Sequence, residues 1–299
     1  MQTLTQIRGI LESAGLAPRK AMGQNFLIDH NLMGKLLELA DPGGGQTVLE
    51  VGPGTGSLTE ELLARCQHGK LVCVELDRGL GDVLADRFAA AENFTLIRGD
   101  ALAGKHKLSP EVIAAIAPDA HLVSNLPYNI ATPLIAQCLI DSWRAMNSDK
   151  KAGDLCRFNR MTFTVQREVA DRLLAGVESQ AYGQVSILVG LLGKCRPGPI
   201  VPATAFWPRP AVASRIMRID FDAASAAGVV NVDVLTAVLA GAFAQRRKQI
   251  GSMLRRDDVA FAAAALAEAF GRAKIDPTCR PEQIGPEQYR ILANALCGG

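Results

Sequence analysis

Short apolar runs alternate with helix-like segments between residues 47 and 174. The runs have the length of buried strands, and the segments between them repeat their apolar residues at helical spacing. This alternation is typical of an α/β domain in which helices cover a mostly parallel sheet. Strands are expected at 47–51, 71–75, 94–97, 121–124 and 161–166, and helices at 58–65, 80–90, 133–140 and 168–174.

A different pattern begins after residue 221. Residues 222–228 are small and polar, as in a linker, and the segments 235–243, 260–270 and 286–296 are helix-like. The hydrophobic pattern therefore predicts an α/β domain over 1–223 and a small all-helical domain over 224–299.

Three further segments carry weaker signals. Residues 185–192 and 215–221 are apolar and are candidates for extending the sheet, one of them as an antiparallel edge strand. Residues 147–160 are polar and charged, which predicts a solvated loop. An N-terminal amphipathic helix is expected to end before Gly15 and Pro18. Its apolar face consists of Leu4, Ile7, Ile10, Leu11 and Ala14.

Composition places the chain among ordinary globular proteins, with 48% hydrophobic and 21% charged residues. The formal net charge is only +2, so a nucleic-acid surface has to arise from local clusters of cations. The seven cysteines form no CxxC pair, which argues against a structural metal site. With no signal peptide and no apolar run long enough to span a membrane, we expect a cytoplasmic protein.

A glycine-rich loop, Gly52-Pro53-Gly54-Thr55-Gly56, follows the first expected strand and opens a helix. Such a loop lets the backbone approach a nucleotide-like ligand, and its spacing alone also fits a nicotinamide dinucleotide. Glu75, at the end of the next strand, is placed to bind ribose hydroxyls of either ligand.

Two carboxylates favour S-adenosylmethionine over a dinucleotide. This cofactor carries a positive sulfonium and no pyrophosphate, so acids near the loop suit it better than a phosphate-binding helix. Glu50 precedes the loop, and Asp100 follows the third strand, where it is able to accept a hydrogen bond from an adenine amine. For any one acid alone a solvated strand end is the favoured alternative, but the order of Glu50, Glu75 and Asp100 along successive strand ends argues against three coincidences.

The tetrapeptide Asn125-Leu126-Pro127-Tyr128 follows the fourth strand. Proline restricts the backbone, so the Asn125 amide, the Leu126 carbonyl and the Tyr128 ring are held as two acceptors and a stacking surface for a planar amine. A simple turn with a core tyrosine is the alternative. Since ligands bind beyond the carboxyl ends of parallel strands, loop and tetrapeptide share one edge, which predicts N-methylation.

These motifs resemble the small-subunit (16S) ribosomal RNA adenine dimethyltransferase family, the KsgA/RsmA type, over nearly the whole chain. The resemblance implies a Rossmann-like class I S-adenosylmethionine-dependent methyltransferase sheet with a C-terminal helical RNA-binding domain, in a monomer. The matching segments are 19–27, 50–56, 166–173, 182–183, 201–210 and 243–248. The segment 147–160 is longer than the family pattern.

The resemblance also implies roles for individual residues. Residues 1–30 correspond to a lid segment, and Phe206 to an aromatic partner of Tyr128, although a buried aromatic is an equal alternative. The implied catalytic residues are Asn125, Leu126, Tyr128 and Phe206. The implied cofactor contacts are Asn25, Leu27, Glu50, Gly52, Gly54, Glu75, Leu76, Asp100, Ala101 and Asn125. The implied RNA contacts are Arg19, Lys20, Arg246, Arg247 and Lys248.

The implied reaction is dimethylation of two adjacent adenines in a hairpin loop near the 3′ end of 16S ribosomal RNA, on immature small subunits during ribosome biogenesis. Three alternatives remain open at this stage. They are a catalytically idle ribosome-assembly or transcription factor, a large-subunit RNA methyltransferase, and a nicotinamide oxidoreductase.

Overall fold

The computed structural model describes residues 1–19, 22–43, 45–104, 107–148, 155–256 and 261–297. Contacts divide the chain into two compact units, one of residues 1–170 and 196–220 and the other of residues 171–195 and 221–299. The expected boundary near residue 224 lies close to the start of the last piece. Residues 171–195, which were expected in the α/β domain, group with the C-terminal helices instead.

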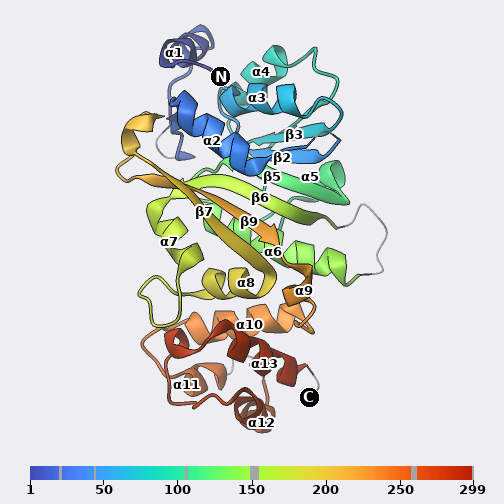
Figure 1. Cartoon of the computed structure of the whole chain (residues 1–299), viewed down its shortest axis with the longest axis vertical. Coiled ribbons are helices and arrows are strands. Elements are labelled where there is room, and N and C mark those ends of the chain that lie inside the picture. Colours follow the sequence, from blue (N-terminus) through green and yellow to red (C-terminus); the bar gives the residue numbers. More distant parts are fainter. Residues whose placement is uncertain (20–21, 44, 105–106, 149–154, 257–260, 298–299) are drawn as a thin grey trace. The chain divides into compact units, whose positions relative to one another are not determined.

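A seven-stranded sheet forms the centre of the first unit (Figure 1), in the order β4-β3-β2-β5-β6-β9-β7. The pairs β3–β4, β2–β3, β2–β5 and β5–β6 are parallel, and β6–β9 is antiparallel. The mostly parallel α/β sheet expected from the sequence is confirmed. The strands are β2 (Thr47–Val51), β3 (Lys70–Glu75), β4 (Phe94–Arg98), β5 (Asp119–Asn125), β6 (Arg157–Gln166), β7 (Gly193–Val201) and β9 (Ser214–Phe221).

Helices bury their apolar faces against this sheet. The helix α2 crosses in front of the strands in Figure 1, and its buried Met33, Leu36 and Leu37 share a core cluster with Leu58 and Leu62 of α3 and with sheet residues. The N-terminal amphipathic helix is also present, with Ile7 and Leu11 buried. The helices of the first unit are α1 (Leu4–Ser13), α2 (His30–Ala40), α3 (Ser57–Arg65), α4 (Arg78–Arg87), α5 (Pro110–Ile116) and α6 (Ala131–Met146), and the residues of α7 (Arg167–Leu174) are divided between the two units.

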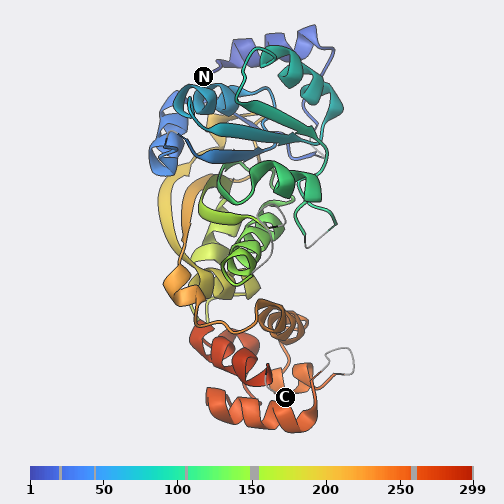
Figure 2. The same cartoon turned by 90° about the vertical axis from the view of Figure 1, so that its right-hand side faces the viewer.

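Helices build most of the second unit, whose last members are coloured orange to red in Figure 2. The helix α13 packs against α8, α10 and α12. Tyr182 is buried and donates a hydrogen bond from its hydroxyl to the Ile284 carbonyl at 2.9 Å. The helices are α8 (Gln184–Leu192), α9 (Ala223–Ala226), α10 (Val232–Phe243), α11 (Ile250–Leu254), α12 (Ala263–Ala273) and α13 (Pro286–Leu296).

One of the two expected sheet extensions was wrong, and the other is confirmed, since residues 214–221 form β9 and pair antiparallel with β6. The run 185–192 is the helix α8, whose residues are buried on nearly every side, so its periodicity could not separate a helix from a strand. Next to β9 the sheet ends in an edge strand that was not expected, β7, whose Pro197 and Pro199 are tolerated because an edge strand leaves backbone groups unpaired.

The expected loop at 147–160 was also partly wrong. Residues 157–160 begin β6, where Arg157 pairs with Asp119 and Arg160 with Asp220. Residues 149–154 lie outside the described residues. Among the described residues, no helix is long and apolar enough to cross a membrane.

Candidate active site

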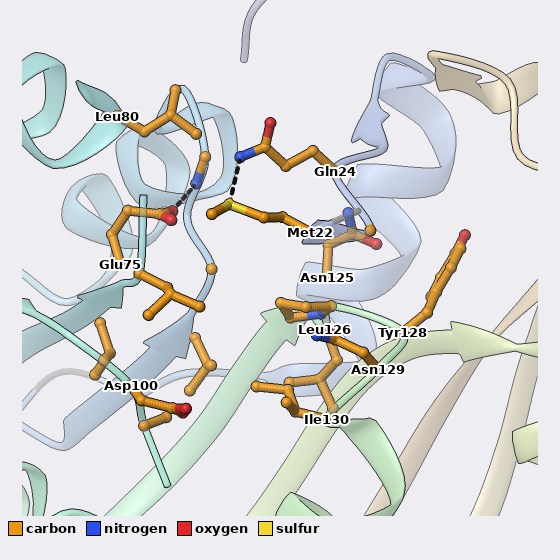
Figure 3. A pocket seen from close by; sticks show the side chains of 18 of the residues that line it. Met22, Gln24, Glu75, Leu80, Asp100, Asn125, Leu126, Tyr128, Asn129 and Ile130 are labelled. Carbon is orange, nitrogen blue, oxygen red and sulfur yellow. Dashed lines mark hydrogen bonds between the residues drawn. The ribbon is translucent and has the colours of Figure 1, made fainter. Parts of the chain in front are cut away.

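A pocket of about 240 Å³ opens at the carboxyl edge of the sheet (Figure 3). The ends of β2, β3, β4 and β5 meet there because these strands are parallel neighbours. The segment 22–26 completes the wall. The predicted site residues that line the pocket are Asn25, Gly52, Gly54, Glu75, Leu76, Asp100, Ala101, Asn125, Leu126 and Tyr128.

Gly52 and Gly54 allow the loop to pass very close to other pocket residues. Both have positive φ angles, 71° and 63°. A Cβ atom would lie 2.7 Å from Pro127 at Gly52 and 2.8 Å from Phe26 at Gly54. A side chain at either position would therefore push the tetrapeptide or the segment 22–26 out of place.

Glu75 ties the end of β3 to the glycine loop. Its carboxylate accepts hydrogen bonds from the backbone N–H groups of Gly54 at 3.0 Å and of Asp77 at 2.9 Å. Burial raises the pKa of Glu75, and these two donors oppose the shift. Leu76, next to it, is 53% exposed and presents an apolar surface to the pocket.

Asp100 lies on the same wall, beyond the end of β4. Its side chain is exposed, and its Oδ1 accepts the backbone N–H of Leu102 at 2.9 Å. The second oxygen of the carboxylate is thus the one suited to an external donor.

Asn125 uses the two ends of its amide differently. Its Nδ2 donates to the backbone carbonyl of Asn25 at 3.0 Å, which orients the group. Its Oδ1 is buried and has no hydrogen-bond partner among the residues that the structure describes. A buried acceptor without a partner is costly, so this oxygen is suited to a donor brought in by a ligand.

The rest of the tetrapeptide is held in place by neighbouring strands. The Leu126 N–H donates to the Thr164 carbonyl at 3.2 Å, and the Tyr128 hydroxyl bonds the Ser214 hydroxyl at 3.0 Å. Burial raises the pKa of Tyr128. The ring of Tyr128 is thereby positioned beside Asn125 (Figure 3).

Glu50 does not line this pocket, contrary to expectation. Its carboxylate is buried and accepts hydrogen bonds from Thr59 Oγ1 at 2.7 Å and Cys73 Sγ at 3.4 Å. Burial raises its pKa to about 7. Glu50 thus connects β2 to α3 and β3.

Leu27 and Phe206 are also absent from the pocket lining, for one shared reason. They are cross-strand partners in the short pair β1 (Phe26–Leu27) and β8 (Phe206–Trp207). Residues that face each other across a strand pair project to the same side, and this side is the core, where both are buried. The opposite side carries Phe26, which lines the pocket and stacks on Trp207 at 6.3 Å.

The basic residues lie in separate places. Arg19 contacts the buried Asp77 carboxylate at 3.3 Å, and Lys20 is outside the described residues. The exposed Arg246, Arg247 and Lys248 follow the end of α10 in the second unit. Among the described residues, no cluster of three or more acids, histidines or cysteines is arranged to hold a metal ion.

Comparison with known proteins identifies the group to which this site belongs. A family model described as ribosomal RNA adenine dimethylase matches residues 15–288. The chain belongs to this family. It is 36% identical to a ribosomal RNA small subunit methyltransferase A from Phenylobacterium zucineum, over 99% of this chain and 94% of the relative. It is 37% identical to that of Caulobacter vibrioides, over 94% and 98%.

Solved structures share the fold of this dimethylase. A dimethyladenosine transferase from Plasmodium falciparum matches with a TM-score of 0.66 and 21% identity, over 89% of this chain and 95% of that chain. The 23S rRNA methyltransferase ErmE matches with a TM-score of 0.58 and 22% identity, over 91% and 99%. The Rossmann-like fold is confirmed.

S-adenosylmethionine is the cofactor expected for a ribosomal RNA adenine dimethylase, and the pocket residues fit it. Gly52 and Gly54 leave room at the loop, Glu75 and Asp100 supply carboxylates, and Leu76 supplies an apolar surface. The nicotinamide alternative is not supported by the family.

Several residues of the dimethylase pocket escaped the sequence analysis. Phe26 alternates with Leu27 along a strand of two residues, too short for periodicity to assign its side. Gln24 stands in the recognised segment 19–27 but was given no role. The other unpredicted lining residues are Met22, Gly23, Val51, Val74, Leu80, Gly99, Pro127, Asn129 and Ile130.

Proposed function

We propose that this protein transfers methyl groups from S-adenosylmethionine to the exocyclic N6 of adenines in small-subunit ribosomal RNA and forms dimethyladenosine. The observation that carries the proposal is the buried Oδ1 of Asn125, an oriented acceptor in the pocket at the carboxyl edge of the sheet. The near full-length relatives named ribosomal RNA small subunit methyltransferase A support the choice of RNA.

The chemical difficulty is that the lone pair of an adenine amine is delocalised into the ring. Acceptance of its N–H groups by Asn125 Oδ1 and the Leu126 carbonyl favours a tetrahedral nitrogen, whose lone pair is then free to attack. The cofactor, when bound, would supply an electrophilic methyl group on a sulfonium that leaves as a neutral thioether, and the methylated nitrogen then loses its extra proton to water. Positioning of reactants can contribute roughly 7–11 kcal/mol to a lowered barrier.

Tyr128 offers the flat surface for the target base, since its hydroxyl is held by Ser214. A second transfer requires the site to lose one N–H contact and accept a methyl group. The neutral amide of Asn125 tolerates this better than a carboxylate, which would keep an unpaired charge.

The target adenine has to leave its stack to enter the pocket, which favours a loop in an accessible ribosomal particle. We therefore propose immature small subunits as the substrate, a monomeric enzyme, and action in the cytoplasm. The exposed cations at Arg246, Arg247 and Lys248 are proposed to bind phosphates, and so is Lys20.

The test is incubation with methyl-labelled S-adenosylmethionine and immature small subunits, followed by nuclease digestion and mass spectrometry. We expect dimethyladenosine at two adjacent adenines in a hairpin loop near the 3′ end of 16S RNA. Label on large-subunit RNA would favour the large-subunit alternative. Particle binding without any label would favour an idle assembly factor.

A further inference from the structure

The side chain of Gln24 lies in the pocket wall and makes bonds in two directions. Its Nε2 donates to Asp77 Oδ2 at 3.2 Å, and its Oε1 accepts the backbone N–H of Arg19 at 2.7 Å. In Figure 3 the Gln24 amide also faces Met22, on the same segment. Gln24 thus fastens the segment 22–26 to the start of α4.

Asp77 is suited to receive this contact because it is buried and held by several partners. Its side chain is 3% exposed, and its Oδ1 accepts the N–H groups of Gly79 and Leu80 as the cap of α4. The Arg19 guanidinium contacts its Oδ2 at 3.3 Å.

Asp77 also connects the segment to the glycine loop. The Asp77 N–H donates to one oxygen of Glu75, and the other oxygen of Glu75 accepts the Gly54 N–H. A continuous series of hydrogen bonds therefore runs from Gln24 through Asp77 and Glu75 to Gly54.

The segment 22–26 is held on the opposite side by Asn125, whose Nδ2 donates to the Asn25 carbonyl. Gly23 lies against the same tetrapeptide, where an added Cβ would be 3.5 Å from the Tyr128 nitrogen. The segment therefore spans the pocket between two anchors, one at the end of β3 and one at the end of β5.

We propose that Gln24 is a positioning residue: its bond to Asp77 holds the segment 22–26 across the pocket, so that closure of the segment and cofactor binding strengthen each other. This inference rests on the proposed function, because a cofactor in the pocket would contact both the segment 22–26 and the side of the pocket that contains Glu75. Arg19 supports this arrangement through its contact with Asp77. By linkage, the factor by which closure of the segment raises cofactor affinity equals the factor by which bound cofactor favours closure.

The test is the substitution Gln24→Glu, which keeps the acceptor for Arg19 but sets a carboxylate against Asp77. Binding of S-adenosylhomocysteine is measured by calorimetry, and hydrogen exchange of residues 22–27 is measured with and without it. We expect the variant to bind about tenfold more weakly and to lose the exchange protection. The exposed Gln67→Glu is the matched control and should behave like the wild type.

A second substitution excludes a merely structural effect. Adding Asp77→Asn to Gln24→Glu exchanges donor and acceptor, and asparagine still caps α4. The double variant should recover affinity and protection. Wild-type-like binding and exchange in Gln24→Glu, or no recovery in the double variant, would overturn the inference and leave the proposed function intact. Failure of the wild-type protein to bind S-adenosylhomocysteine would overturn both.

Discussion

At the scale of single residues, Asn125 explains why an amide rather than a carboxylate suits the tetrapeptide. One end of the amide donates to the backbone of Asn25, and the other is a buried acceptor in the pocket. An aspartate would place a negative oxygen against the Asn25 carbonyl. The identity of the residue is thus set by the neighbouring segment as well as by the substrate.

Substitution of Asn125 by alanine removes the acceptor for the target amine. We expect kcat for methyl transfer to fall at least about 100-fold, as for other oriented acceptors and donors in active sites. Affinity for S-adenosylhomocysteine should fall by no more than about tenfold, because the variant loses the Asn125 bond that anchors the segment 22–26 but keeps the carboxylates and the glycine loop. The measurements are single-turnover transfer and calorimetry, with the exposed Asn159→Ala as the control. Normal turnover by Asn125→Ala would disprove its assignment as acceptor.

Glu50 makes the stability of the fold depend on pH. Its pKa is raised from 4.5 to about 7 by burial, so the folded state keeps its proton where the unfolded state has lost it. The stability it contributes is complete below pH 4.5 and is lost as the pH rises through about 7. With ~1.4 kcal/mol for each pKa unit, the loss is about 3 kcal/mol.

The substitution Glu50→Gln should therefore remove this pH dependence. The free energy of unfolding is measured by urea titration from about pH 4.5 to about pH 8. Over this range it should decrease by about 3 kcal/mol more in the wild type than in the variant. The exposed Glu12→Gln serves as the control. If the free energy of unfolding depends on pH in the same way for Glu50→Gln and the wild type, the raised pKa of Glu50 is wrong.

At the scale of elements, the strand pair β1–β8 decides which of its four apolar residues face the pocket. Its register places Phe26 opposite Trp207 and Leu27 opposite Phe206. Phe26 lines the pocket, whereas Leu27 and Phe206 belong to the core beneath α2 and α3. A shift of one residue would exchange the two sets.

Conservative substitutions separate these sides of the strand pair. Phe206→Leu should reduce the free energy of unfolding by roughly 1–3 kcal/mol, since it leaves a partly filled space in the core, with unchanged affinity for S-adenosylhomocysteine. Phe26→Leu should weaken that affinity severalfold. Urea unfolding and calorimetry measure the two effects. Loss of methyl transfer by Phe206→Leu at full stability would instead support its original assignment as the ring beside Tyr128.

At the scale of the whole molecule, the pocket and the residues proposed to bind RNA belong to different compact units. The pocket belongs to the first unit, while Arg246, Arg247 and Lys248 are exposed in the second, where Arg246 donates to the Gln180 carbonyl at 3.1 Å. Cations that bind phosphates contribute mainly to affinity and its salt dependence.

Replacement of Arg246, Arg247 and Lys248 by alanine should weaken binding to immature small subunits and flatten its dependence on salt. Each lost phosphate contact should reduce the log–log slope by about 0.7–0.9. A triple variant of Lys35, Arg65 and Arg157, cations already paired with acids, is the control. An unchanged slope would reject the RNA role of the basic cluster.

Much of the site was predictable because parallel strands end at one edge. Knowing only that Gly52, Glu75, Asp100 and Asn125 each end or follow a strand was enough to bring them together. The helix α8 was not predictable, since an apolar run buried on almost all sides has no periodicity to read. The strand β7 was not predicted because it contains two prolines, which a strand tolerates only at the edge of a sheet.

The sequence by itself determined the α/β fold, the family and the order of chemical groups along the sheet edge, because these depend on local patterns and chain direction. Only the tertiary structure decided which way individual side chains face. Glu50 turns to Thr59 and Cys73, Phe206 pairs with Leu27, 179 residues earlier, and Gln24 bonds to Asp77. Such contacts join residues of different elements, and the apolar and polar pattern within one element does not encode them.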